Sequence, residues 1–243
     1  MRFMFPTKKH AGTPTARASW VTVTLLLGWL LAGNVSAQSL PDRVEKPDFK
    51  VGDYWIFNKI DGNNGKLLDV TSETVTKIDA SGYRLIGTEG AGAFVNTTLR
   101  NSQFNLIRTD GGQGYPKAYV HTSKPFYPHF AFPLTKGKGW TQKVELTWSS
   151  HPSVLITFDS LEAKVIGWEM VTVPAGNFQA LKIELSGWNN GNNGIDRWSG
   201  HVKETLWFSP LVRNVVRTEY VEKISASPYR HDITELQGYG LTP

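Results

Sequence analysis

The sequence contains no cysteine, and this absence removes several kinds of chemistry. Without a thiol, the chain cannot form disulfides, use a cysteine nucleophile or bind zinc through thiolates. It also cannot carry the lipid that lipoproteins attach to a cysteine at their cleavage point. Disulfides are not needed for stability either, because a chain of about 200 residues buries roughly 70% of its unfolded surface.

A long hydrophobic run is also missing. The longest run extends from Trp20 to Ala32, about 13 residues, whereas a membrane-spanning helix needs roughly 20. It follows a basic segment and precedes Val35-Ser36-Ala37, which places small residues where a signal peptidase requires them. The pattern predicts a signal peptide over residues 1–37, cleaved after Ala37, and a periplasmic or secreted protein. An uncleaved N-terminal anchor is the alternative. No later run is long enough to predict a membrane span after cleavage.

The mature chain has little net charge. The whole sequence has 26 basic and 21 acidic residues, a net charge of +5. Four of the basic residues and none of the acidic ones lie in the predicted signal peptide: Arg2, Lys8, Lys9 and Arg17. A nucleic-acid-binding domain requires a basic face on the folded protein, so no nucleic-acid partner is predicted.

Recognised catalytic and metal-binding motifs are absent as well. The histidines of the mature chain show no H-x-H or H-E-x-x-H spacing, and no G-x-S-x-G serine motif is found. These histidines are His121, His129, His151, His201 and His231. Asp159 and Glu162 are close in sequence, and we expect them to flank a turn. No metal site and no cofactor are predicted, and an enzyme is not favoured, although a hydrolase whose site assembles only in space stays open.

Two segments rich in Asn and Gly invite a calcium interpretation. They are residues 61–65 and residues 189–196, and each contains a single carboxylate. Calcium is bound by six to eight oxygens, and neither segment has the spacing of an EF-hand loop. Asn and Gly also form hairpin turns without an ion, which is the interpretation we favour.

Apolar and polar residues alternate along several segments of the C-terminal half. Leu181, Ile183 and Leu185 alternate with polar residues, and the segments around Val144 and Val216 follow the same rule. A period of two with one apolar face is typical of antiparallel strands. About twelve short strands punctuated by Gly, Asn and Pro predict an all-β fold: a large curved antiparallel sheet, an open barrel or a sandwich. Residues 38–50 are predicted to be an extended arm and residues 51–243 a single domain.

Aromatic residues gather in the segment 124–134, where three prolines predict neither a helix nor a central strand. Exposed aromatic rings can stack on sugars, and a concave apolar face could hold a lipid. The same rings could instead fill the core of a thin sheet. The candidate ligand-binding residues are Phe126, Tyr127, Phe130, Phe132, Trp188 and Trp198.

Two later segments contain the most distinctive motifs of the chain. One contains Pro174, Ala175, Gly176 and Phe178, and the other runs from Trp207 to Pro210. Together with Val51-Gly52-Asp53-Tyr54-Trp55, they resemble exported bacterial β proteins of unknown function, the DUF3108-like families. The resemblance covers most of residues 50–222 in patches. It implies a curved antiparallel sheet and brings no catalytic residues. The family pattern usually has Gly near Arg213-Asn214, where this chain has none.

The residues themselves give these motifs a structural interpretation. Pro174 and Gly176 favour a tight reversal of the chain. We expect Phe178 to enter the core beside Leu181, Trp207 or Phe208 to face inward, and Pro210 to end a strand.

The sequence therefore predicts an exported non-enzymatic β protein that binds an apolar or cell-envelope component, a lipid for example, on a concave sheet face. The alternatives are a carbohydrate-binding or carbohydrate-active domain, and a hydrolase.

Overall fold

The computed structural model describes residues 40–114, 119–149, 153–224 and 229–243. These residues form one compact unit, built almost entirely of β-strands. The predicted signal peptide and the cleavage point after Ala37 lie outside the described residues.

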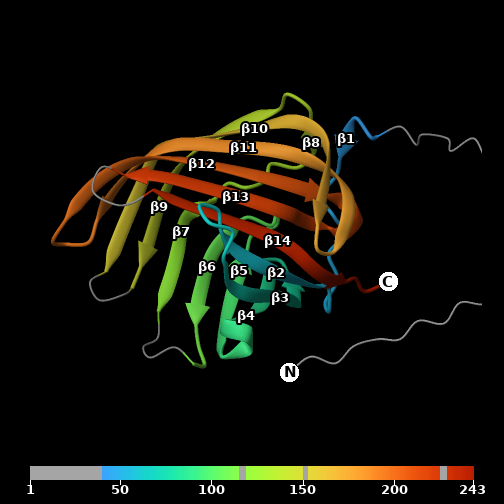
Figure 1. Cartoon of the computed structure of the whole chain (residues 1–243), viewed down its shortest axis with the longest axis horizontal. Coiled ribbons are helices and arrows are strands. Elements are labelled where there is room, and N and C mark those ends of the chain that lie inside the picture. The colour runs from blue at the N-terminus through green and yellow to red at the C-terminus, as the bar shows by residue number, and fades with distance from the viewer. Residues whose placement is uncertain (1–39, 115–118, 150–152, 225–228) are drawn as a thin grey trace, which may run out of the picture. The chain divides into compact units, whose positions relative to one another are not determined.

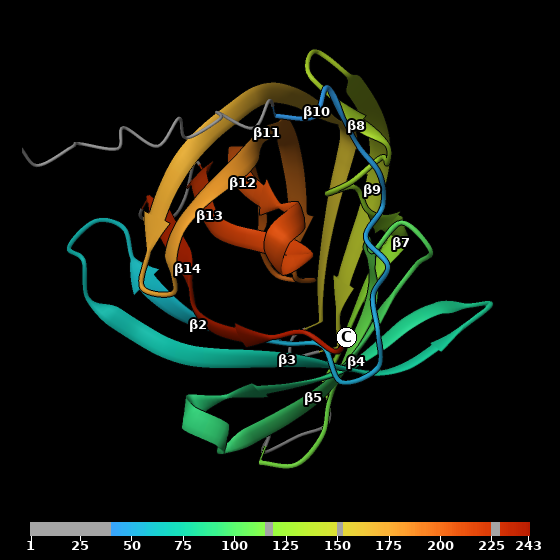
Figure 2. The ribbon, with the colours of Figure 1, turned by 90° about the vertical axis from the view of Figure 1, so that its right-hand side faces the viewer.

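Twelve strands close into an antiparallel barrel in the order β10-β11-β12-β13-β14-β2-β3-β4-β5-β6-β7-β9, and β9 pairs again with β10 (Figures 1 and 2). Strands β1 and β8 form a separate two-stranded sheet. The strands are β1 (Arg43–Val44), β2 (Tyr54–Asp61), β3 (Leu67–Asp79), β4 (Gly82–Glu89), β5 (Phe94–Arg100), β6 (Leu106–Gly111), β7 (Val120–Tyr127), β8 (Leu134–Thr135), β9 (Gly139–Trp148), β10 (Val154–Val173), β11 (Gly176–Asn192), β12 (Arg197–Ser209), β13 (Asn214–Ile224) and β14 (Arg230–Gly240). The prediction of an all-β fold with a curved antiparallel sheet is confirmed, and the sheet closes completely, whereas the sequence had suggested an open barrel or a sandwich.

The predicted alternation gives the barrel its inner and outer faces. Leu181, Ile183 and Leu185 of β11 are buried, whereas Lys182 and Glu184 between them take part in ion pairs on the outer face. Neighbouring strands are in register, so buried residues of one strand meet buried residues of the next, as Leu185 meets Glu204 of β12. This register places every second residue inside the barrel.

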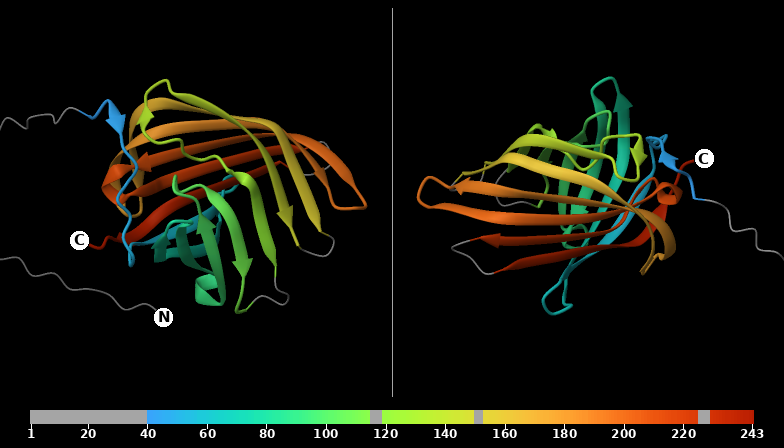
Figure 3. Two further views of the ribbon diagram at one scale, coloured as in Figure 1. Left: turned by 180° about the vertical axis from the view of Figure 1, so that it is seen from behind. Right: turned by 90° about the horizontal axis from the view of Figure 1, so that it is seen from above.

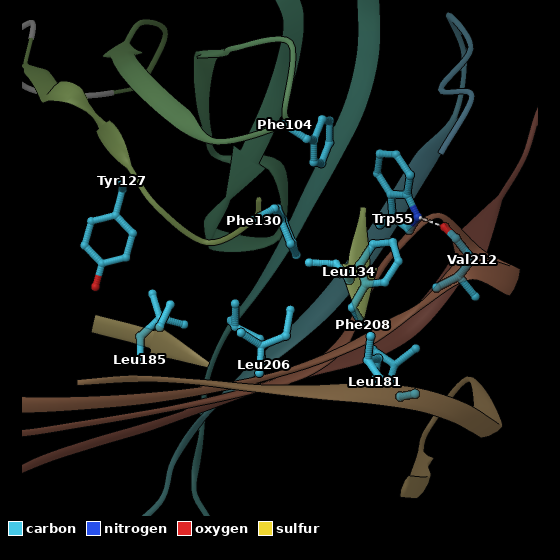
Figure 4. Close-up of a cluster of buried hydrophobic side chains, with 14 of the residues drawn as sticks. Trp55, Phe104, Tyr127, Phe130, Leu134, Leu181, Leu185, Leu206, Phe208 and Val212 are labelled. Carbon is cyan, nitrogen blue, oxygen red and sulfur yellow. Dashed lines mark hydrogen bonds between the residues drawn. The ribbon is translucent and has the colours of Figure 1, made fainter. Parts of the chain in front are cut away.

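One end of the barrel, which we call the sealed end, is filled with apolar side chains. It is the end at which β2 begins and β12 finishes. Phe49 of the N-terminal arm stacks on Phe104 with ring centroids 4.0 Å apart, and both rings contact Trp55. The short 3₁₀ turn η2 (Pro210–Val212) lies within the ring of strands (Figure 2), and Figure 3 shows the arm crossing the same end. Figure 4 shows how these side chains converge. Burial of this many large apolar groups is the main stabilising contribution to the fold.

A buried ion pair links three segments of the chain at the sealed end. The Asp53 carboxylate is fully buried and accepts hydrogen bonds from Nη1 of Arg213 at 2.9 and 3.1 Å and from the Thr242 amide at 2.8 Å. The indole N–H of Trp55 donates to the Val212 carbonyl at 2.7 Å. Arg213 has φ +58°, the left-handed conformation that Gly adopts without strain. Arg213 therefore combines this backbone conformation with a side chain that compensates the charge of the buried Asp53.

The other distinctive motifs also have structural roles. Val173 pairs with Gly176 across a tight turn, and Gly176 has φ +131°. Phe178 is buried, as expected, with its ring edge toward Tyr239. Phe208 is the inward residue of its pair, since Trp207 donates instead to Glu169 on the outer face. Strand β12 ends at Ser209, directly before Pro210, as predicted.

The prediction for residues 124–134 is wrong in one respect. Strand β7 continues through Pro125 to Tyr127 and lies between β6 and β9, although prolines were expected to exclude a central strand. The pairing with β9 reaches only Lys124, and the register with β6 shifts between Leu106 and Arg108. Pro125 therefore lies at an irregularity, where a missing amide proton breaks no ladder hydrogen bond.

Candidate functional site: a polar cavity inside the barrel

Beyond the sealed end, the interior of the barrel is not filled. A cavity of about 400 Å³ lies between β3–β7 on one side and β12–β14 on the other. Most of its lining side chains carry hydroxyl, amide, imidazole or charged groups. The polar ones include Thr71, Glu73, Thr88, Glu89, Asn96, Thr98, Arg100, Thr109, His121, His129, Glu204, Thr218 and Thr234. A few apolar residues complete the wall: Phe57, Phe130, Trp148 and Leu206.

The cavity arises because the inward residues change type along each strand. On β12 the inward series runs from Phe208 and Leu206 to Glu204. On β4 it runs from Leu85 to Gly87, which has no side chain to fill the space, and then to Glu89. The same alternation that packs the sealed end thus delivers polar groups to the cavity.

Hydroxyl groups of adjacent strands pair on the cavity wall. The hydroxyls of Thr98 and Thr109 lie 3.2 Å apart, and Asn96 donates to Glu89 at 3.1 Å. A hydroxyl can donate one hydrogen bond and accept two, so each paired threonine keeps some capacity for a further partner. These groups can therefore bind a polar molecule without a costly rearrangement.

Arg100 and Glu73 form an ion pair at the boundary between the cavity and the sealed end. Nη2 of Arg100 lies 2.9 and 3.2 Å from the two carboxylate oxygens. The guanidinium also covers the Phe104 ring, 4.8 Å from its centroid. Nε of Arg100 is buried and, within the described residues, has no hydrogen-bond partner. The ion pair therefore leaves one buried donor unused.

Glu204 is the centre of a second polar cluster. The Tyr127 hydroxyl donates to its carboxylate at 3.1 Å, and Nε2 of His129 lies 3.3 Å from the other oxygen. Burial, with the negative charge of Glu204 beside it, raises the pKa of Tyr127 well above its ordinary value. Tyr127 therefore stays protonated and acts as a hydrogen-bond donor.

His121 stacks on Trp148 with ring centroids 4.3 Å apart and planes 3° from parallel. Burial lowers the pKa of His121 to about 4, so its imidazole is neutral at neutral pH. Nε2 of this ring is buried and has no hydrogen-bond partner among the described residues. The ring pair forms a flat, uncharged part of the cavity wall.

The aromatic residues proposed from the sequence do not form one exposed platform. Tyr127 and Phe130 are buried at 8% and 4% exposure, and Phe126 and Phe132 are partly buried. The reason is that the backbone of Phe130 is held inside by two hydrogen bonds of 2.8 Å with Asn105. Phe130 does line the cavity.

The two tryptophans of the segment 187–200 lie on opposite faces of the barrel wall. Trp198 packs against Gly191, where an added Cβ would come within 2.0 Å of the indole ring. Trp188 is 65% exposed on the outer face. The structure therefore separates these residues from the group around Phe130.

The Asn/Gly segments use their side-chain oxygens within turns. Asp61 accepts from the Asn63 amide at 2.9 Å, and Asn193 accepts from the amides of Ile195 and Asp196. No group of three or more His, Asp or Glu side chains in the described part of the chain is arranged to hold a metal ion. These contacts fit the hairpin-turn interpretation.

Glu73, Arg100 and Glu204 were not predicted from the sequence. Each occupies an inward position of a strand, and two of them lie two residues from an apolar inward residue: Glu73 from Val75, and Glu204 from Leu206. A charged residue that interrupts an otherwise apolar face was the available signal. Its meaning depended on knowing which face is enclosed.

Comparison with known proteins adds information on the fold. No protein-family model matches the chain, and a search of curated proteins found no match. Among solved structures, a Bacteroides fragilis protein thought to be exported, with a YmcC-like fold, matches at a TM-score of 0.51 and 17% identity, over 81% of this chain and 99% of that one.

Two further solved structures match more weakly. A Parabacteroides distasonis protein classed provisionally as a lipoprotein has a TM-score of 0.44 and 16% identity, over 81% of this chain and 99% of that one. The hypothetical lipoprotein YmcC of Escherichia coli has a TM-score of 0.42 and 11% identity, over 77% and 84%. In the described residues, no helix has the length and apolar character needed to cross a membrane. On the strength of the Bacteroides fragilis structure, the chain has a YmcC-like fold.

Proposed function

We propose that this chain is an exported, non-enzymatic protein that holds a small polar component of the cell envelope inside its barrel. The observation that carries the proposal is the segregation of the interior. Apolar side chains fill the sealed end, while hydroxyl, amide and charged groups from opposite walls converge on one cavity of about 400 Å³. That volume lies within the range of roughly 300–1,000 Å³ that is usual for ligand pockets.

The lining favours a polar ligand over the apolar one expected from the sequence. An acyl chain in this cavity would displace water from Thr98, Asn96 and Glu89 without replacing its hydrogen bonds. Burying a polar group without a partner costs about 1–3 kcal/mol in proteins. A ligand with hydroxyl or amide groups, such as a single sugar unit, would meet these groups instead. Phe130 and the His121–Trp148 pair would contact its less polar face.

Export belongs to the same proposal. The basic segment, the short apolar run and Val35-Ser36-Ala37 support a signal peptide cleaved after Ala37, and the solved neighbours are described as exported proteins or lipoproteins. The motifs around Pro174 and Trp207 support membership of the DUF3108-like group. N-terminal sequencing of the protein from the periplasm or the medium should begin at Gln38, and a protein that retains residue 1 would contradict the prediction.

A hydrolase is the second candidate, favoured by the position of Glu204 between Tyr127 and His129 at the cavity wall. A carboxylate in such a place can accept a proton during hydrolysis. Turnover of generic ester, phosphate or glycoside substrates that disappears in Glu204→Gln would support it. The absence of turnover with all three classes would reject it for them.

Native mass spectrometry tests the binding function. The protein is purified without denaturation from the envelope fraction of its host, alongside Thr218→Phe, which fills the cavity. We expect the wild-type chain to carry a small polar adduct that denaturation releases, and Thr218→Phe to carry none. Thr98→Val, which removes a hydroxyl without adding volume, should reduce occupancy while the melting temperature changes little. Wild-type protein without an adduct, or an adduct equally abundant in all variants, would reject the proposal.

A further inference from the structure

Trp188 is the most exposed of the tryptophans that the structure describes. It is 65% exposed on the outer face of β11. Its indole N–H has no acceptor among the described residues, whereas four other indoles are anchored. Those four donate to main-chain or side-chain oxygens: Trp55 to Val212, Trp140 to Pro128, Trp168 to Pro41 and Trp207 to Glu169. A large exposed aromatic ring with a free donor contributes nothing evident to the fold.

A β-bulge forms a hollow beside Trp188. Phe158 of β10 pairs with Asn189 and Leu161 pairs with Gly187, so Asp159 and Ser160 lie opposite Trp188 alone and β10 has one extra residue. The hollow, of about 290 Å³, lies between this bulge and the outward residues of β11 and β12. Gly187 is necessary for it, because an added Cβ would come within 2.7 Å of the Ser160 carbonyl oxygen. Bulges often redirect side chains at functional sites.

The side chains around the hollow suit a sugar. His201 is the cross-strand partner of Trp188, and the two rings meet edge to face at 5.5 Å, so they form an aromatic corner. Asp159, Glu162 and Asn190 supply hydrogen-bond acceptors beside the rings. The apolar face of a pyranose can pack on an indole while its hydroxyls donate to such acceptors. The carboxylates disfavour an acidic sugar, because like charges repel.

The hollow continues into two more along the outer face. It shares Glu162 and Ser186 with a hollow of about 530 Å³ that reaches Thr141 of β9. That hollow shares Glu184 with another, of about 210 Å³, that contains Trp207. The three together form a continuous groove across β9 to β13, with the rings of Trp188 and Trp207 in two of its hollows. A groove of this kind fits an extended chain better than a single small molecule.

We propose that this outer groove binds a neutral or amino-sugar-containing oligosaccharide, with Trp188 as its main stacking platform. The site is separate from the cavity inside the barrel, and none of the residues that line its three hollows lines the cavity. Either site can exist without the other.

The test measures binding of the mature chain to an array of neutral, amino-sugar and acidic oligosaccharides, followed by titration of the best binder. Trp188→Ala should weaken binding about tenfold or more, a loss of stacking energy typical of an aromatic ring. Ile195→Ala is the matched control, since Ile195 is an apolar residue with 81% exposure outside the hollows. It should bind as the wild type does, and so should the cavity-filling Thr218→Phe.

Three outcomes would overturn the inference. They are no binding to any glycan on the array, equal affinity of Trp188→Ala and the wild type, and a preference for acidic glycans. Because Trp188 is exposed, its replacement should leave the melting temperature unchanged, and this measurement separates lost binding from lost folding. Failure here with an adduct still present in native mass spectra would leave the inner cavity as the binding site.

Discussion

The two halves of the barrel interior are built on the same strands but serve different purposes. The sealed end buries Trp55, Phe104 and Phe208 against the N-terminal arm and η2. The cavity half presents Glu73, Thr98 and other polar groups to a partly open space. The difference teaches that apolar packing and open polar space are divided along the barrel axis, and the proposed binding function uses only the second. Substitutions at the two ends should therefore have separable effects.

The largest effect is expected at the sealed end. Phe208→Ala removes a fully buried ring that packs edge to face against both Phe130 and Phe132, and we expect a loss of about 3–5 kcal/mol in the free energy of unfolding. Thr218→Ala is the matched truncation in the cavity wall. It should cost less than about 1 kcal/mol, because its side chain already faces empty space. Denaturant titration measures both, and equal losses would contradict the division.

Arg213→Gly should be the next most harmful change, although Gly suits the backbone at this position. The substitution relieves a left-handed conformation worth about 1 kcal/mol but leaves the buried Asp53 charge without its partner, which costs about 3–5 kcal/mol. A net loss of about 2–4 kcal/mol is expected. Adding Asp53→Asn should recover part of this loss, and a double-mutant cycle measures the coupling. If the two changes have additive effects on the free energy of unfolding, the ion pair does not stabilise the sealed end.

A smaller loss in the free energy of unfolding is expected at acid pH, and it should come from His121 in the cavity half. The pKa of His121 is lowered to about 4 in the folded chain, below its ordinary value of 6.5. As the pH falls, the unfolded chain protonates His121 before the folded chain does. The stabilisation that comes from this difference is therefore fully present above pH 6.5 and is lost as the pH falls toward 4. Allowing for partial exposure, we expect about 1–2 kcal/mol. His121→Gln should lose less stability than the wild type between pH 7 and 5. Parallel curves of unfolding free energy against pH would contradict this assignment.

The smallest effect on stability is expected from Thr98→Val. The change removes one neutral hydrogen bond with Thr109, so the free energy of unfolding should fall by less than about 1 kcal/mol. Binding of the proposed polar ligand should nevertheless weaken by about tenfold, since the hydroxyl faces the cavity. A titration with the ligand recovered from the envelope measures this. Unchanged affinity would move the binding site away from this wall.

Much of the fold follows from local pattern in the sequence. The alternation at Leu181, Ile183 and Leu185 predicted a strand with one buried face, and the turn at Pro174–Gly176 predicted its start. Closure of the barrel could not be predicted in this way. It depends on β14 near the C-terminus pairing with β2 near the start of the domain, and no local pattern reports a pairing between such distant segments.

The candidate site was less predictable for the same reason. Glu204 on β12 lines the same cavity as Glu73 on β3 and Arg100 on β5 only because the barrel closes. Aromatic residues were predicted from the sequence to bind a ligand, yet Tyr127 and Phe130 are buried. Tyr127 is hydrogen-bonded to Glu204, and the Phe130 amide to Asn105. The sequence shows which chemical groups are present, whereas their positions inside or outside the barrel determine which of them a ligand can reach.

Native-state hydrogen exchange followed by mass spectrometry tests the division of the barrel most directly. Amides of residues 53–57 and 206–208 should exchange slowest, at the rate of global unfolding, because their side chains belong to the apolar sealed end. Amides of residues 96–98 and 108–110 should exchange faster and become protected when envelope extract is added. Uniform protection along the strands, or protection by the extract that leaves residues 96–98 and 108–110 unchanged, would contradict the account.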